Sequence, residues 1–115
     1  MGKQRQTERI QPFVVACRFV VEEQRFPGFL MNLSRAGARI HSDSEGPPEG
    51  TTLTVEVRMG RQATHVHLPA TVRWVQPSSR GGFVFGVSFD SIAGEEQKIL
   101  EGVIEEFRRR AAQLA

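Results

Sequence analysis

Apolar and polar side chains alternate at period two over much of this chain, and that alternation restricts its fold more than any other feature. A period of two places every second side chain on one face of a β-strand. Polar turns, several with Gly or Pro, separate the runs, and no helical period occurs among them. The pattern predicts an all-β barrel or sandwich of six antiparallel strands, at 13–21, 29–33, 37–41, 53–59, 66–74 and 83–89.

The alternation also predicts which side chains face the core. Cys17 lies in the apolar row of the first strand, so we expect a buried thiol and not a nucleophile. Trp74 and the phenylalanines could form a stacking surface for single-stranded nucleic acid, but their spacing favours the core. The expected inward residues of the last two strands are Val66, Leu68, Ala70, Val72, Trp74, Phe83, Phe85, Val87 and Phe89.

The hydrophobic period changes after Ser91. Acidic residues then stand near the start of the segment and arginines near its end, as suits a helix dipole. We expect a C-terminal helix at about 92–112, packed across an open end of the barrel or on a second copy. The chain of 115 residues suits one domain at 12–115, preceded by a polar leader at 1–11 that we expect to be flexible. Helical spacing relates Ile99, Leu100, Val103, Ile104, Phe107 and Ala111.

Positive charge is concentrated in the leader. Lys3, Arg5 and Arg9 stand there against Glu8, a surplus as large as the net charge of +2 of the whole chain. So small a total does not indicate nucleic-acid binding, but its placement would attract an anionic ligand. With a single cysteine, no signal-peptide core and no apolar run of membrane-spanning length, we expect a cytoplasmic protein that does not insert into a membrane.

Two short motifs lie beside the predicted strands. Arg5 and Arg9 are four residues apart, just before the first strand, and Asn32, Ser34 and Gly37 lie between the second and third strands. Asn and Ser can bond to nearby backbone, and Gly can supply the positive φ of a tight reversal. Taken alone, the second motif predicts only the turn of a hairpin.

The order Arg-x-x-x-Arg and then, about twenty residues later, Asn-x-Ser-x-x-Gly resembles the PilZ domain, the bacterial receptor module for cyclic di-GMP (c-di-GMP). The segments 71–74 and 85–89 look like later strands of that family, and the C-terminal helix follows where the family's helix would be. The resemblance extends from about Arg5 to Arg110. It implies a six-stranded antiparallel PilZ-like β-barrel with a C-terminal helix, which holds c-di-GMP between the two motifs.

The residue types suit the site that the resemblance implies. A guanidinium can grip phosphate oxygens or the O6 and N7 atoms of guanine with two parallel bonds, a role given to Arg5 and Arg9. The opposite wall is given to Asn32, Ser34 and Gly37. The family often has Asp in place of Asn32, and the neutral amide loses the charge that would favour the guanine N–H donors. Possible additional contacts are Gln4, Arg35, Arg39 and Arg73.

Other chemistry has weaker support. His65 and His67 share a strand face, but no further ligand stands at a suggestive spacing, so we interpret them as outward polar residues and expect no metal. No phosphate loop and no nucleophile with a base is recognisable. We therefore expect no catalytic residues, no enzyme activity and no cofactor apart from the ligand.

The resemblance thus implies a stand-alone c-di-GMP receptor. Bound ligand would order the leader and change the contacts of the protein with a downstream effector protein. An alternative is a PilZ-fold adaptor that acts by protein contacts without nucleotide. A third possibility, nucleic-acid binding on the barrel face, would show affinity that falls steeply with salt. The regulated process, the number of nucleotides bound and the oligomeric state stay open.

Overall fold

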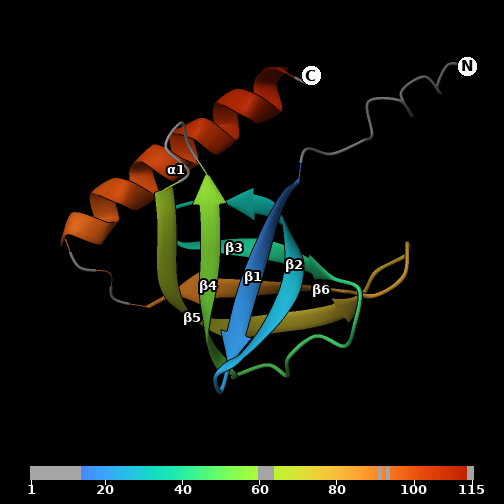
Figure 1. Ribbon diagram of the computed structural model, residues 1–115. Helices are drawn as coiled ribbons and strands as arrows, with labels where there is room; N and C mark the ends of the chain where they lie inside the picture. Colours follow the sequence, from blue (N-terminus) through green and yellow to red (C-terminus); the bar gives the residue numbers. More distant parts are fainter. Residues whose placement is uncertain (1–13, 60–63, 91, 93, 114–115) are drawn as a thin grey trace, which may run out of the picture.

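The protein is a closed barrel of six antiparallel strands with one C-terminal helix (Figure 1). The computed structural model describes residues 14–59, 64–90, 92 and 94–113. Around the barrel the strands follow the order β1-β2-β3-β6-β5-β4, and β4 closes on β1. This confirms the predicted fold class. The elements are β1 (Val15–Val21), β2 (Gln24–Leu33), β3 (Gly37–Ser42), β4 (Thr52–Met59), β5 (Thr64–Pro77), β6 (Phe83–Phe89) and α1 (Gly94–Gln113).

The alternating apolar side chains fill the barrel. Phe19 is buried there, stacked on Phe26 with ring centroids 5.4 Å apart and edge-on to Phe85 at 5.1 Å. Each fully buried Phe or aliphatic side chain contributes about 1.5–3 kcal/mol of transfer free energy. The side chains of Leu30, Ile40, Val55, Leu68, Ala70 and Phe85 have no exposed surface at all. The period-two pattern therefore identified most of the core correctly.

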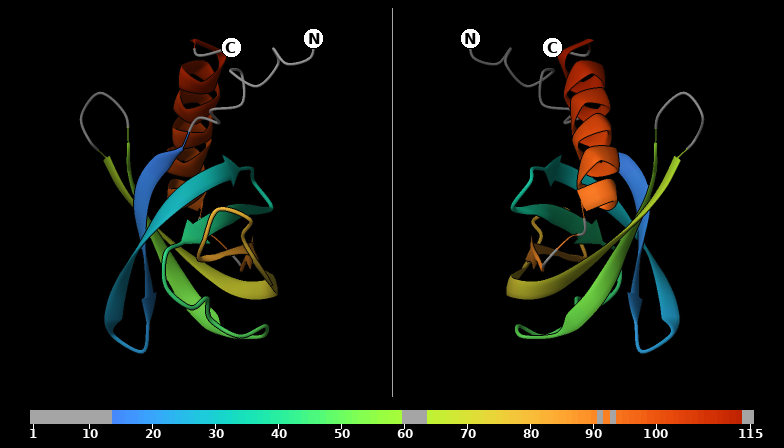
Figure 2. Two further views of the ribbon diagram at one scale, coloured as in Figure 1. Left: turned by 90° about the vertical axis from the view of Figure 1, so that its right-hand side faces the viewer. Right: turned by 90° about the vertical axis from the view of Figure 1, so that its left-hand side faces the viewer.

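The helix α1 covers one end of the barrel. Its side chains Leu100, Val103, Ile104 and Phe107 belong to the same buried cluster as the barrel interior. Figure 2 shows α1 lying across that end, and the strands that it contacts most are β4 and β5. The apolar face of the helix was expected to pack either across an open end of the barrel or on a second copy. In the structure it packs on the barrel of its own chain.

Cys17 is buried, as expected. Removal from water raises the pKa of its thiol to about 12. Because the thiolate is the reactive form, the group is inert toward oxidation and alkylation at neutral pH while the barrel stays folded.

The expected inward position of Trp74 is wrong. The side chain is 39% exposed, whereas Val72 is buried. The reason is a β-bulge in β5: Val72 lies opposite Val87, but Trp74 lies opposite Gly86, so two residues of β5 face one of β6. The additional residue reverses the alternation and brings Arg73 and Trp74 to the outer surface together.

Candidate functional site

The turn between β2 and β3 is held by the Ser34 hydroxyl. Its oxygen accepts hydrogen bonds from the backbone N–H groups of Ala36 at 3.2 Å and Gly37 at 3.3 Å. The hydroxyl donates in turn to the Gly37 carbonyl at 3.3 Å. One donor and two acceptor positions are all that a hydroxyl offers. Ser34 thus fixes the turn, and its use by a ligand would replace one of these bonds.

Gly37 is required for a reason other than the expected one. The described residues with positive φ do not include it, so its predicted role in a left-handed reversal is wrong. A Cβ at Gly37 would instead overlap the carbonyl oxygen of Val87 in the neighbouring strand. The residue must be glycine because β3 and β6 approach closely there.

A second bulge changes the direction of the side chains at the end of β2. Leu30 lies opposite Ile40 but Asn32 lies opposite Arg39, so the register shifts between Leu30 and Asn32. Leu30 stays buried, whereas Met31 is half-buried and Asn32 is exposed. The bulge in β2 and the bulge in β5 lie on either side of the β3–β6 pair, and each turns a site side chain outward.

The two bulges create one row of residues across four strands. Asn32 faces Arg39, Arg39 faces Gly86, and Gly86 faces Trp74. A hollow of about 360 Å³ lies over this row. We call it the Asn32 hollow. Its lining is Asn32, Ser34, Ala36, Gly37, Ala38, Arg39, Arg73, Trp74, Gly86, Val87 and Ser88.

Trp74 forms the apolar side of the Asn32 hollow. A Cβ at Gly86 would overlap the indole ring, so the ring lies directly over the glycine. An indole held in this way, with 39% of the side chain exposed, offers a face on which a planar base can stack. The period-two spacing of Trp74 had favoured the core over a stacking surface. The pairing of Trp74 with Gly86 that exposes the indole is set by the register of β5 and β6.

The charge in the Asn32 hollow is positive. Its lining includes Arg39 and Arg73 and, among the described residues, no carboxylate. Arg73 donates from Nε to the Ser88 hydroxyl at 2.7 Å, and within the described part of the chain this bond does not use its terminal N–H groups. Guanidinium groups, a side-chain amide and an aromatic face together suit an anionic ligand with a planar base.

The other predicted site residues lie elsewhere or outside the described residues. Arg35 does not line the hollow but pairs with Glu101 of α1, with Nη2 and Oε2 3.2 Å apart. Gln4, Arg5 and Arg9 are not among the described residues. The structure therefore brings together Asn32, Ser34, Gly37, Arg39 and Arg73, and leaves Arg35 apart.

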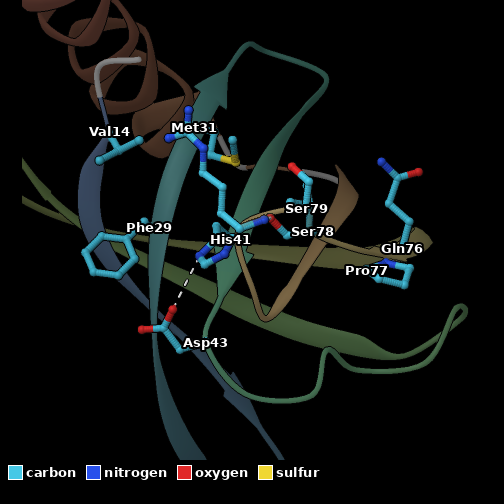
Figure 3. Close-up of a pocket in the computed structure, with 11 residues that line it drawn as sticks. Val14, Phe29, Met31, His41, Asp43, Gln76, Pro77, Ser78 and Ser79 are labelled. Carbon is cyan, nitrogen blue, oxygen red and sulfur yellow. Dashed lines mark hydrogen bonds and ion pairs between the residues drawn. The ribbon is translucent and has the colours of Figure 1, made fainter. Parts of the chain in front are cut away.

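A larger groove adjoins the Asn32 hollow on the same outer face (Figure 3). Its floor crosses the same four strands one row away, where Phe29 faces His41, His41 faces Val84, and Val84 faces Gln76. His41 Nε2 lies 2.9 Å from the Gly81 carbonyl oxygen, and Nδ1 lies 3.7 Å from the Asp43 carboxylate. We call this cavity of about 780 Å³ the Phe29 groove.

Among residues 14–59, 64–90, 92 and 94–113, no three His, Cys, Asp or Glu side chains come together as a metal site would need. The one helix in the described residues is not long and apolar enough to cross a bilayer.

Comparison with known proteins gives a consistent result. The PilZ domain family model matches residues 3–106. The PilZ domain of YcgR from Escherichia coli, solved with c-di-GMP, is similar at a TM-score of 0.69 and 17% identity, over 87% of this chain and 86% of that chain. No curated protein sequence matches significantly.

Two longer structures contain a similar domain. The inhibitor of motility MotI (DgrA) from Bacillus subtilis has a TM-score of 0.69 and 17% identity, over 90% of this chain and 49% of that chain. PlzA from Borreliella burgdorferi, solved in complex with c-di-GMP, has a TM-score of 0.58 and 13% identity, over 87% of this chain and 36% of that chain. At these identities the likeness shows the fold.

Proposed function

This chain belongs to the PilZ domain family, and from that premise we propose that it is a receptor for c-di-GMP that binds the nucleotide in the Asn32 hollow. The observation that carries the proposal is the pair of bulges, which brings an amide, two guanidinium groups and an indole face to one outer surface. YcgR and PlzA, which share the fold, were solved with this nucleotide.

Each side chain has a role that its chemistry allows. The Asn32 amide oxygen accepts from the N–H donors of a guanine edge. Trp74 stacks on a guanine, since such stacking needs only a planar π face. Arg39 and Arg73 bind phosphate oxygens with their guanidinium forks. Ser34 and Gly37 hold the shape of the wall, Ser34 through the turn and Gly37 through the close approach of β3 to β6.

The leader, residues 1–11, supplies the remaining cations. Val15 pairs with Leu30, so Val14 stands beside the Met31–Asn32 end of β2. An extended chain spans at most about 3.3–3.6 Å per residue, so Arg9 can lie up to roughly 17 Å from Val14. Asn32 lies on β2, the strand paired with β1, so Arg9 can reach that side of the Asn32 hollow. Arg5 and Arg9 close over the ligand from the side opposite Asn32.

Binding becomes a signal through the leader. The ligand's negative charge draws the leader onto the barrel, and the ordered leader changes the surface that an effector protein meets. In this proposal the protein is cytoplasmic and not an enzyme, and 12–115 act as the rigid domain to which the leader closes. Amide hydrogen exchange of the leader should slow at saturating c-di-GMP; unchanged exchange would contradict the relay.

Titration calorimetry with c-di-GMP tests the receptor itself. We expect saturable binding that gives the stoichiometry directly and that GTP does not compete away. An absence of heat, together with no displacement of a fluorescent c-di-GMP analogue, would contradict the proposal. It would leave the adaptor that acts by protein contacts alone, in line with a fold shared with an inhibitor of motility.

Trp74→Ala should weaken c-di-GMP binding without unfolding the barrel. Stacking on an aromatic side chain contributes about 1–3 kcal/mol per base, so the dissociation constant should rise about 5- to 150-fold. The exposed indole fills no core space, so the unfolding midpoint should change little. Phe29→Ala removes an equally exposed aromatic from the neighbouring row and is the matched control. An unchanged affinity in Trp74→Ala would show that the indole does not contact the ligand.

A further inference from the structure

We propose that Ser88 is a positioning residue of the Asn32 hollow, which holds Arg73 so that the terminal N–H groups of its guanidinium can grip a phosphate of the ligand. The inference deepens the proposed function and rests on it. Arg73 Nε lies 2.7 Å from the Ser88 hydroxyl oxygen, and both side chains line the hollow. Within the described residues, Arg39, the other arginine of the lining, has no such bond.

Arg73 needs a side-chain anchor because it is the additional residue of the bulge in β5. Val72 faces Val87 and Trp74 faces Gly86, so no residue of β6 stands opposite Arg73. A bulged residue lies outside the regular pairing of the two strands. An arginine side chain also has many rotamers and loses much conformational entropy when it is fixed. Without a bond of its own, the guanidinium would sample many directions above the sheet.

Ser88 is well placed to supply that anchor. It lies in β6 with a paired strand on each side, opposite Gly37 of β3 and Thr71 of β5. A residue in the middle of a sheet has little freedom to move, so its hydroxyl occupies a fixed position. Among the described residues, the bond with Arg73 is the only hydrogen bond of that hydroxyl.

The bond determines which part of the guanidinium stays available. An arginine carries one N–H on Nε and its other N–H donors on the two terminal nitrogens. Ser88 accepts from Nε, so the terminal nitrogens keep their donors for two parallel bonds to phosphate oxygens. A guanidinium that is fixed before the ligand arrives loses less entropy on binding, which makes binding tighter. Lysine could not do both, because all its donors are on one atom.

Ser88 could instead contact the ligand directly, since it lines the hollow. A double-mutant cycle separates the two roles. If Ser88 acts through Arg73, its removal has no effect once Arg73 is replaced by alanine. If Ser88 contacts the ligand itself, its removal costs the same affinity in both backgrounds.

The first measurement uses the full chain without nucleotide. Exchange of the Arg73 Nε–H with water is followed by NMR, and the signal is assigned by its absence in Arg73→Lys. The bond to Ser88 should make this exchange about 3- to 10-fold slower in the wild type than in Ser88→Ala. Ser88→Thr keeps a hydroxyl and should keep the slow exchange. Equal exchange rates in the wild type and in Ser88→Ala would overturn the proposal.

Titration with c-di-GMP then measures the consequence for binding. Ser88→Ala should raise the dissociation constant about 3- to 10-fold, and Ser88→Thr should restore it. Ser79→Ala removes a hydroxyl from the Phe29 groove and is the matched control, with no change expected. In the Arg73→Ala background Ser88→Ala should have no further effect, and a further loss of the same size would overturn the proposal.

The two measurements also distinguish this proposal from the receptor function. If the wild type bound no c-di-GMP, the receptor function would fail. The exchange rate of the Arg73 Nε–H would then decide by itself whether Ser88 positions the guanidinium.

Discussion

Arg9→Ala is expected to bind c-di-GMP at least about 30-fold more weakly than the wild type. Loss of one partner of a desolvated charge pair commonly costs about 2–5 kcal/mol, and 2 kcal/mol corresponds to about 30-fold. In this variant the ligand's phosphates would still contact Arg39 and Arg73 on the barrel. They would lose their contact with the guanidinium of the leader. Calorimetric titration of both proteins at one salt concentration measures the difference.

Two controls separate the guanidinium fork from simple charge. Arg108→Ala removes the same charge from an exposed position near the end of α1 and should leave the affinity within about twofold, since surface charges act weakly through salt. Arg9→Lys keeps the charge but loses the planar fork, so an intermediate affinity is expected. If Arg9→Ala and Arg108→Ala lost the same affinity for c-di-GMP, the leader would act only by general electrostatic attraction and not by a direct contact.

The fold was predictable because alternation at period two is a local property of the sequence. The row Val66, Leu68, Ala70 and Val72 keeps strict alternation and is buried as predicted, whereas Phe83 and Phe89 at the ends of β6 are only half-buried. The prediction failed at Trp74, where a bulge adds one residue to β5. A bulge is a property of the register between two strands, and the sequence of either strand alone does not encode it.

The candidate site was predictable where a motif carried it and not where strand pairing did. Asn32 stands in the motif, and the structure places it in the hollow together with Arg39 and Arg73. The apolar side of the hollow, Trp74 over Gly86, arises from contact between β5 and β6 and has no motif of its own. Arg35 shows the converse, since its place in the turn suggested a ligand contact but its guanidinium pairs with Glu101 on α1.

Gly37→Ala should destabilise the barrel by about 3 kcal/mol and lower the unfolding midpoint by roughly 10–15 °C. The added Cβ would overlap the Val87 carbonyl oxygen. Neither atom can rotate away, because the Cβ is fixed to the β3 backbone and the carbonyl belongs to the paired β6 backbone. Relief requires β3 and β6 to separate where they form the wall of the Asn32 hollow. Thermal and urea unfolding followed by circular dichroism measure the loss.

Gly102→Ala is the matched control for the same chemical change. Gly102 lies in the interior of α1, and a Cβ there meets nothing within 4 Å. Alanine in a helix interior is more stable than glycine by about 0.5–1 kcal/mol, so this variant should unfold a few degrees higher. If Gly37→Ala were as stable as the wild type, the conclusion that β3 and β6 approach too closely for a Cβ at this position would be wrong. If it is destabilised as expected, a loss of c-di-GMP binding in that variant reports a displaced wall. Direct contact on the barrel side is then tested by variants of Asn32, Arg39, Arg73 and Trp74.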